Sequence, residues 1–134
     1  MPKRVLIVDD DPDIRCTVRS LLESRGYECE EAENGVAALA QLGSGCFELV
    51  ITDNLMPVMS GVELSEWLTE VPKGKVPAVI LLSGDVSKQD RTRAMKAGVY
   101  SILSKPYDCD DLLFMVTQAV SSREPHRSLF SPPH

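Results

Sequence analysis

The amino-acid sequence predicts an α/β protein built on a doubly wound parallel β-sheet with helices on both faces. Five short strand-like runs alternate with segments of helical spacing, which is the pattern of repeated β/α units. The inner runs are continuous stretches of Val, Ile and Leu, as is typical of parallel strands covered on both faces. Four of the five runs end in a polar group, and the carboxyl ends of parallel strands share one edge of the sheet.

The first half of the chain contains two strand–helix units. The first is a strand over Val5–Val8, followed by a helix that begins near Pro12 and stops before Gly26. The second is a weak, polar strand over residues 27–31, expected at a sheet edge, and a short helix capped by Asn34.

The third unit is a strand over residues 49–52 and a helix over residues 62–68. Pro72, Gly74 and Pro77 break the chain after this helix. The fourth strand therefore begins only after these breaks.

The last two units are expected at residues 78–82 and 87–97, and at residues 101–104 and 108–120, with Asp108 as a helix cap. Periodicity is lost from Ser121 onward. We therefore predict one domain over residues 1–120 and a mobile tail or linker over residues 121–134.

Length and composition suit a single domain of 134 residues with one core. The formal net charge of −6 argues against direct nucleic-acid binding, which depends on clustered Lys and Arg. No apolar stretch approaches the ~20 residues that cross a bilayer, and no secretory signal precedes the first strand. The expectation is a cytoplasmic protein without a membrane partner.

The four cysteines are widely and irregularly spaced, without a C-x-x-C pair or a nearby histidine. They are Cys16, Cys29, Cys46 and Cys109. We expect reduced thiols and no zinc site.

Polar side chains suited to a phosphoryl group and a metal follow the four runs. Asp9 and Asp10 follow the first run, and Asp53, Ser83 and Lys105 follow the third, fourth and fifth. These groups are expected to meet at the carboxyl edge of the sheet. Adjacent acids repel each other unless a cation offsets their charge, which favours a hard divalent cation at this edge.

Each of these side chains also has a simpler interpretation. Asp11 and Asp13 are expected to cap the following helix, and the acid pair before them could do the same. On the residues alone, Asp53 is either a nucleophile or a metal ligand. Lys105 could be a surface lysine or a partner for an aspartate and a phosphoryl oxygen, and Ser83 is a weak signal by itself.

The order of these groups along the chain resembles the receiver domain of two-component response regulators. The resemblance covers about residues 3–120 and rests on residues 5–12 (VLIVDDDP), 53–61 (DNLMPVMSG), 82–84 (LSG), 97–98 (AG) and 105–107 (KPY). It implies a flavodoxin-like sheet with strand order 2-1-3-4-5.

The resemblance also implies the roles of the metal-binding residues. Mg²⁺ would be held by Asp10, Asp53 and the backbone carbonyl of Leu55, with Asp9 acting through a water. Asp53 would accept a phosphoryl group from a histidine of a sensor kinase or of a phosphotransfer protein. Both histidines of this chain, His126 and His134, lie in the predicted tail, so the donor is expected to be another protein.

Ser83 and Lys105 would bind the phosphoryl oxygens, and the bond between Lys105 and Pro106 would be cis. Asp85 could influence the lifetime of the phosphorylated state. The protein would then act as a signalling switch rather than as an enzyme with a turnover of its own.

By the same resemblance, the output surface is the fourth helix, fifth strand and fifth helix, which could also form a dimer. The fourth helix offers four cations to an unknown protein partner, although a solvated helix face explains these charges equally well. They are Lys88, Arg91, Arg93 and Lys96. The chain resembles either a stand-alone regulator or a receiver domain from a larger protein such as a hybrid kinase.

Two positions depart from the pattern of the family. Ile102 occupies the place of an aromatic switch residue, with Tyr100 two places earlier, and Ser83 replaces the commoner threonine. One alternative is therefore a receiver-like module that works without phosphorylation. The other is an aspartyl-nucleophile phosphatase of the haloacid dehalogenase kind, but Leu55 stands where that family places its second aspartate.

Overall fold

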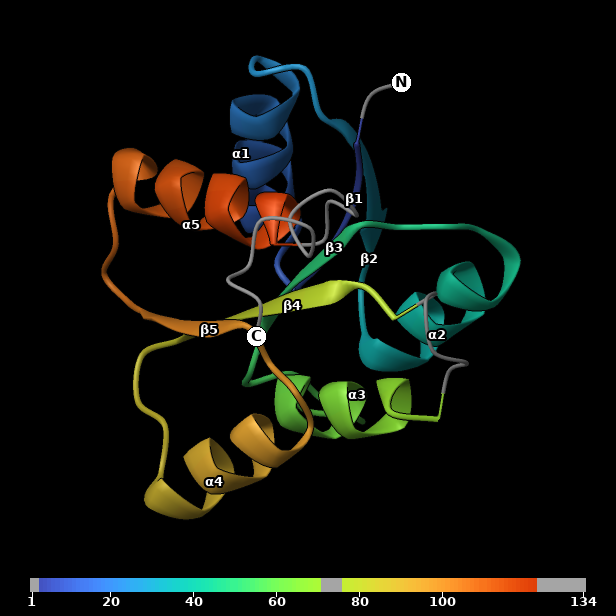
Figure 1. Ribbon diagram of the computed structural model, residues 1–134, viewed down its shortest axis with the longest axis vertical. Helices are drawn as coiled ribbons and strands as arrows, with labels where there is room; N and C mark the ends of the chain where they lie inside the picture. The colour runs from blue at the N-terminus through green and yellow to red at the C-terminus, as the bar shows by residue number, and fades with distance from the viewer. Residues whose placement is uncertain (1–2, 71–75, 123–134) are drawn as a thin grey trace, which may run out of the picture.

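The computed structural model describes residues 3–70 and 76–122, in which five strands alternate with five helices (Figure 1). The strands are β1 (Arg4–Val8), β2 (Glu28–Ala32), β3 (Leu49–Asp53), β4 (Ala78–Ser83) and β5 (Ser101–Ser104). The helices are α1 (Pro12–Glu23), α2 (Gly35–Ser44), α3 (Gly61–Leu68), α4 (Lys88–Lys96) and α5 (Cys109–Ser121). The predicted breaks at Pro72 and Gly74, and the tail from residue 123 onward, lie outside the described residues.

All five strands are parallel and follow the order β2-β1-β3-β4-β5, which confirms the predicted doubly wound sheet. The polar strand β2 is an edge strand, as its composition indicated. The chain leaves β1 toward β2 on one side and returns to β3 on the other. The carboxyl ends of β1 and β3 therefore flank the switch point where ligands bind in open α/β sheets.

Helices cover both faces of the sheet (Figure 1): α1 and α5 lie on one face, and α2, α3 and α4 lie on the other. Alternate residues of each strand serve the two layers, since Val5 and Ile7 pack with α1 and α5 while Leu6 and Val8 pack with α2 and α3. Every residue of β3 is buried. The inner strands are thus held rigidly right up to their carboxyl ends.

Short polar side chains begin the helices and so fix the loops that follow the strands. Asp11, Asn34, Ser60, Ser87 and Asp108 each accept a hydrogen bond from a backbone N–H in the first turn of the following helix. The cap at Asn34 and the cap at Asp108 confirm the sequence predictions. The predicted caps and strand ends together place the β–α loops at one edge of the sheet.

The second strand begins one residue later than predicted. Tyr27 still belongs to the turn after α1, because its N–H donates to the Leu22 carbonyl at 3.2 Å. Gly26 makes this turn possible by adopting a φ of 90°, a region that favours glycine.

The cysteines all carry free thiols, and burial raises the pKa of the Cys29 thiol to about 11.

Candidate functional site

Five of the six predicted site residues, all except Leu55, lie at the carboxyl edge of the sheet, each placed by the end of a strand. Asp9 and Asp10 follow β1, Asp53 and Ser83 are the last residues of β3 and β4, and Lys105 follows β5. Asp9, Asp53 and Ser83 are buried, with 4%, 7% and 2% of their surface exposed, whereas Asp10 is exposed. The site therefore has a buried floor and one acid open to solvent.

Three carboxylates converge at this edge. Asp9, Asp10 and Asp53 each offer an oxygen, and these oxygens all lie within 4.8 Å of one another. Burial raises the pKa of the Asp9 carboxyl above its ordinary value, and the charge of Asp53 adds to this effect, while a hydrogen bond from the Asp11 N–H opposes it. The cluster therefore carries an electrostatic cost that a cation would remove.

This donor set fits Mg²⁺. Hard divalent cations prefer carboxylate and carbonyl oxygens, and Mg²⁺ in particular binds through one or two carboxylates while keeping several waters. Asp10, the exposed member of the cluster, leaves an open side through which a hydrated ion could enter. The part assigned to the Leu55 carbonyl remains a prediction.

Lys105 pairs directly with Asp53. Its Nζ donates to Asp53 Oδ1 at 2.8 Å, although the two residues are 52 positions apart in the sequence. Burial lowers the pKa of Lys105, but the hydrogen bond and charge of Asp53 outweigh this and raise the pKa above its usual value. The ammonium is thus protonated at neutral pH and faces the carboxylate proposed to be modified.

The bond between Lys105 and Pro106 is cis, as the resemblance implied. The Lys105 N–H donates to the Ser83 carbonyl at 2.8 Å, which ties the end of β5 to the end of β4. The Ser83 hydroxyl itself donates to the Asp85 carbonyl at 3.1 Å. It is therefore engaged in the β4–α4 loop, and within the described residues it makes no hydrogen bond to Asp53.

Asn54 is a site residue that the sequence reasoning missed. It is 2% exposed, and its Oδ1 accepts a hydrogen bond from the Val62 N–H at 3.1 Å. Its backbone carbonyl accepts from the Gly61 N–H at 3.0 Å, and its own N–H donates to the Leu82 carbonyl at 3.0 Å. Asn54 thus closes the β3–α3 loop beside Asp53. Its position directly after an aspartate at a strand end was the available signal.

Gly61 allows α3 to begin close to Asp53. A Cβ at this position would lie 2.5 Å from Leu81 Cδ1 and 2.6 Å from the Asp53 carbonyl oxygen. Both distances are shorter than any ordinary contact of a Cβ atom. The Asp53 carbonyl belongs to the backbone, so it cannot move aside as a flexible side chain could. Gly61, the last residue of the 53–61 motif, therefore allows the loop to approach the end of β3 closely.

Arg15 is a second residue that the sequence reasoning missed. Its Nη1 donates to the Asp9 carbonyl at 2.6 Å and its Nε donates to Glu31 Oε1 at 2.9 Å. The side chain is 16% exposed. Arginine at the first turn of a helix that follows an acid pair was the only sequence signal for this contact.

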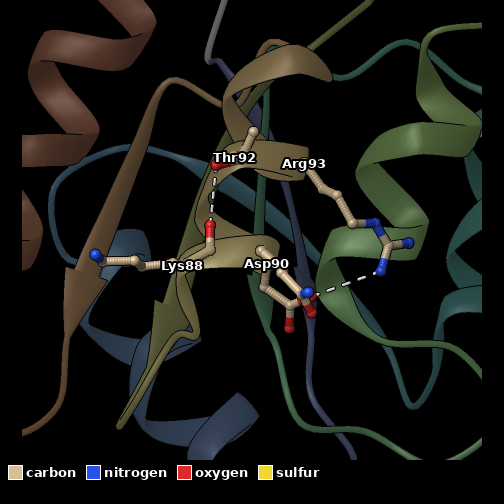
Figure 2. Close-up of a pocket in the computed structure, with 5 residues that line it drawn as sticks. Lys88, Asp90, Thr92 and Arg93 are labelled. Carbon is tan, nitrogen blue, oxygen red and sulfur yellow. Dashed lines mark hydrogen bonds and ion pairs between the residues drawn. The ribbon is translucent and has the colours of Figure 1, made fainter.

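The predicted output surface is partly engaged within the molecule. Arg93 reaches from α4 toward α3, where its guanidinium makes two hydrogen bonds of 2.6 and 2.9 Å to Glu66, and it also lies 3.6 Å from Asp90 (Figure 2). Figure 2 draws the residues that line a pocket here, and within residues 3–70 and 76–122 they all belong to α4. Arg93 is therefore an interhelical contact rather than a free cation.

Ile102, within β5, and Tyr100, just before it, lie in different environments. Ile102 packs against an apolar cluster of Val62, Leu81 and Ala94 beneath α4. The Tyr100 N–H donates to the Val79 carbonyl at 2.8 Å, and 41% of the residue is exposed. The position of the usual aromatic switch is thus an apolar contact between β5, β4 and α4.

Among residues 3–70 and 76–122, no helix has both the length and the hydropathy that crossing a bilayer requires.

Comparison with known proteins identifies one family. A family model described as the response regulator receiver domain matches residues 5–117. A receiver domain described as CheY-like, from Methanospirillum hungatei, has a similar structure, with a TM-score of 0.86 and 31% identity over 92% of this chain and 97% of that one. The receiver domain of a histidine kinase from Syntrophus aciditrophicus is similar at 31% identity and a TM-score of 0.83, covering 92% and 93% of the two chains.

Curated relatives differ in total length. An uncharacterised 14.6 kDa protein of Leptolyngbya boryana is 37% identical over 85% of this chain and 87% of its own length. The response regulator MprA of Mycobacterium is 31% identical over 98% of this chain, but this chain spans only 56% of that protein. Similarity to such longer proteins therefore concerns the receiver part alone.

Proposed function

Since the chain belongs to the family of response regulator receiver domains, we propose that Asp53 accepts a phosphoryl group from a phosphohistidine of another protein. The observation that carries this proposal is the position of the Asp53 carboxylate, which is hydrogen-bonded to the Lys105 ammonium and clusters with two further aspartates at the sheet edge. The donor would be a sensor histidine kinase or a histidine phosphotransfer protein. One relative, TmoS of Ectopseudomonas mendocina, is itself named a sensor histidine kinase.

The transfer requires a nucleophile, a neutralised phosphoryl group and a leaving group. A carboxylate oxygen of Asp53 forms a bond to phosphorus while the phosphorus–nitrogen bond of the phosphohistidine breaks, and the electron pair returns to the imidazole. Lys105 is already directed at Asp53 and would pair with a phosphoryl oxygen once the group is in place. Its raised pKa keeps it charged for this role.

Mg²⁺ would be held by Asp10, Asp53 and the Leu55 carbonyl, with Asp9 acting through a water. When bound, the ion supplies the positive charge that lets a dianionic phosphoryl group approach an acidic cluster. Asp9 and Asp10 then share the task of fixing this charge beside Asp53. Because these acids repel one another without a cation, phosphorylation is expected to require the metal.

The output would be a changed protein-binding surface rather than a released product. Ser83 would exchange its bond to the Asp85 carbonyl for a bond to a phosphoryl oxygen, which would change the β4–α4 loop. Ile102 lies in the apolar cluster under α4, so repacking there would carry the change to the surface. The face of α4, β5 and α5 would meet the downstream protein or a second copy of the chain.

The proposal is tested by intact-protein mass spectrometry after incubation with acetyl phosphate, a small phosphoryl donor. Wild type, Asp53→Asn and the matched surface control Asp13→Asn would be compared with Mg²⁺ and with a chelator. We expect a gain of one phosphoryl mass in wild type and in Asp13→Asn, only with Mg²⁺, and no gain in Asp53→Asn.

A beryllofluoride binding measurement separates a short-lived product from an inactive site, since beryllofluoride mimics the phosphoryl group without being hydrolysed away. Mg²⁺-dependent beryllofluoride binding that is lost in Asp53→Asn would support the switch even if the phosphorylated form decays quickly. Absence of both the adduct and beryllofluoride binding would favour the phosphorylation-independent module instead.

A further inference from the structure

The guanidinium of Arg15 connects the acid pair after β1 to the edge strand β2. It donates from Nη1 to the Asp9 carbonyl at 2.6 Å and from Nε to Glu31 Oε1 at 2.9 Å. Only 16% of the arginine side chain is exposed. A partly buried, charge-assisted pair of hydrogen bonds has a more definite geometry than a fully exposed ion pair, because the solvent competes less for its members.

The bond to Asp9 acts on the main chain of the proposed metal site. The Asp9 carbonyl belongs to the planar peptide unit that joins Asp9 to Asp10, so its direction fixes the backbone from which the Asp10 side chain leaves. On the other side of Asp9, its N–H donates to the Ala32 carbonyl at 3.1 Å, and its Oδ1 accepts from the Asp11 N–H at 2.9 Å. The bond from Arg15 thus holds the Asp9 carbonyl, the one backbone group of Asp9 that these two bonds leave unrestrained.

The bond to Glu31 holds the guanidinium itself in place. Glu31 Oε2 also accepts from Arg19 Nη1 at 2.9 Å, and the Glu31 backbone carbonyl accepts from Gln41 Nε2 at 2.6 Å. The glutamate is therefore fixed by α1 and α2 together. Because a guanidinium is planar and rigid, fixing its Nε end also fixes the direction of its Nη1 donor.

We propose that Arg15 is a positioning residue of the cation site: it holds the peptide unit between Asp9 and Asp10 in the orientation in which both carboxylates face a divalent cation. This inference rests on the function proposed above. Arg15 touches neither the cation nor the phosphoryl group, and it acts through the Asp9 carbonyl. Partners that orient metal ligands in this way are worth about 10- to 100-fold in metal affinity.

The sign of the effect separates this role from simple electrostatics. A positive charge near a cation site repels the cation, so removing Arg15 would tighten Mg²⁺ binding if charge were its only contribution. Positioning predicts the opposite, since freeing the peptide unit weakens binding. Arg19 is a matched control: it lies on the same helix and contacts the same Glu31, but within the described residues its ion pairs are with Glu23 and Glu31 and not with Asp9.

The test is the Mg²⁺ dissociation constant of the full 134-residue chain, measured by isothermal titration calorimetry for wild type, Arg15→Gln, Arg15→Lys and Arg19→Gln. Thermal unfolding without Mg²⁺ shows whether each variant is folded. We expect Arg15→Gln to bind Mg²⁺ about 10-fold more weakly than wild type, while Arg19→Gln stays within about twofold. Arg15→Lys keeps the charge but cannot reproduce the rigid fork, and is also expected to bind Mg²⁺ more weakly than wild type.

Several results would overturn the inference. Unchanged or tighter binding in Arg15→Gln would leave Arg15 with no positioning role. Equal weakening in both glutamine variants would assign the effect to the contacts with Glu31, which both arginines make, rather than to the bond to the Asp9 carbonyl. If Arg15→Gln does not unfold cooperatively, Arg15→Lys decides, and wild-type affinity in that variant contradicts the proposal. A wild-type chain that binds no Mg²⁺ would remove the proposed function together with this inference, whereas normal wild-type binding isolates the part played by Arg15.

Discussion

At the scale of single residues, Asp9 shows how function opposes stability in this molecule. Its carboxylate is 4% exposed, lies beside two other acids, and has a pKa that burial raises above the ordinary value. An acid whose folded-state pKa is raised binds a proton more tightly when folded than when unfolded. The contribution of Asp9 to the free energy of unfolding therefore falls as the pH rises from its unfolded-state pKa of 3.8 through its folded-state pKa.

The first prediction is that Asp9→Asn stabilises the metal-free protein. The amide removes the buried charge and keeps an Oδ1 acceptor for the Asp11 N–H. At pH 7 with a chelator, we expect the free energy of unfolding to rise by about 1 kcal/mol. The gain should vanish below pH 3.8, where the wild-type carboxyl is protonated in both states. Urea denaturation at the two pH values measures it.

Asp10→Asn is the matched control for this experiment, because it removes a neighbouring acid that is already exposed. It should change the free energy of unfolding less than Asp9→Asn does. A loss of stability at pH 7 in Asp9→Asn would contradict the assignment of an electrostatic cost to that residue.

The strand-end residues of the site could be predicted from sequence, while their supporting contacts could not. Asp9, Asp53 and Lys105 each follow an apolar run, and the parallel arrangement of the runs brings them to one edge. The bond from Arg15 to the Asp9 carbonyl depends on the direction of one peptide unit, and the bonds of Asn54 depend on the path of a loop. A hydrophobic pattern carries no information about the direction of a peptide unit or the path of a loop.

At the scale of helices and strands, α3 begins only where a loop passes very close to β3 and β4. We predict that Gly61→Ala lowers the free energy of unfolding by about 1–3 kcal/mol, since the added Cβ overpacks the interior. The double variant Gly61→Ala with Leu81→Ala should not recover, because the Asp53 carbonyl oxygen would still lie 2.6 Å from the new Cβ. Thermal unfolding measures both, and recovery in the double variant would show that the Leu81 side chain alone causes the clash.

The helix α4 is attached to the fold by little apolar contact. Ala94 is its one buried residue in the structure, and the Arg93 contact with Glu66 joins it to α3. The predicted range of residues 87–97 differs from α4 by one residue at each end, but the partner of Arg93 lies 27 positions away and could not be chosen among many exposed acids. An ion pair between residues far apart in the sequence depends on how their helices pack, so it can be identified only from the folded structure.

We predict that Arg93→Ala speeds amide hydrogen exchange in α4 and leaves exchange in β3 and β4 unchanged. The substitution releases α4 from α3 without opening the core, so the local unfolding free energy falls while the global one changes little. Lys96→Ala, which removes a cation from the end of the same helix, should have a smaller effect. Equal protection in wild type and Arg93→Ala would show that the contact does not restrain the helix.

At the scale of the whole molecule, the site is assembled from segments that only the folded sheet brings together. The Asp9–Asp10 pair and Asp53 are separated by more than 40 positions in the sequence, and they meet because β1 and β3 are neighbours at the switch point. The unfolded chain therefore lacks this site. A ligand that binds the folded state alone must stabilise the whole fold.

We accordingly predict that Mg²⁺ raises the free energy of unfolding of wild type by about 2.7 kcal/mol at 100 times its dissociation constant. Calorimetric unfolding scans over a range of Mg²⁺ concentrations, at constant ionic strength, measure this change. Asp10→Asn should show a smaller rise, since it loses a proposed ligand. A rise that Na⁺ reproduces at equal ionic strength would point to general screening of the acids instead of a specific site.

The most direct test of the central claim is to locate the phosphoryl group after reaction with acetyl phosphate and Mg²⁺. Borohydride reduces an aspartyl phosphate to an alcohol and so marks the modified residue permanently. Trypsin then releases residues 26–73, in which Asp53 is the only aspartate, and residues 5–15, which contain Asp9 and Asp10. Mass spectrometry should find the mark at Asp53 in peptide 26–73 and nowhere else. A mark in peptide 5–15 would contradict the assignment of Asp53 as the phosphoacceptor.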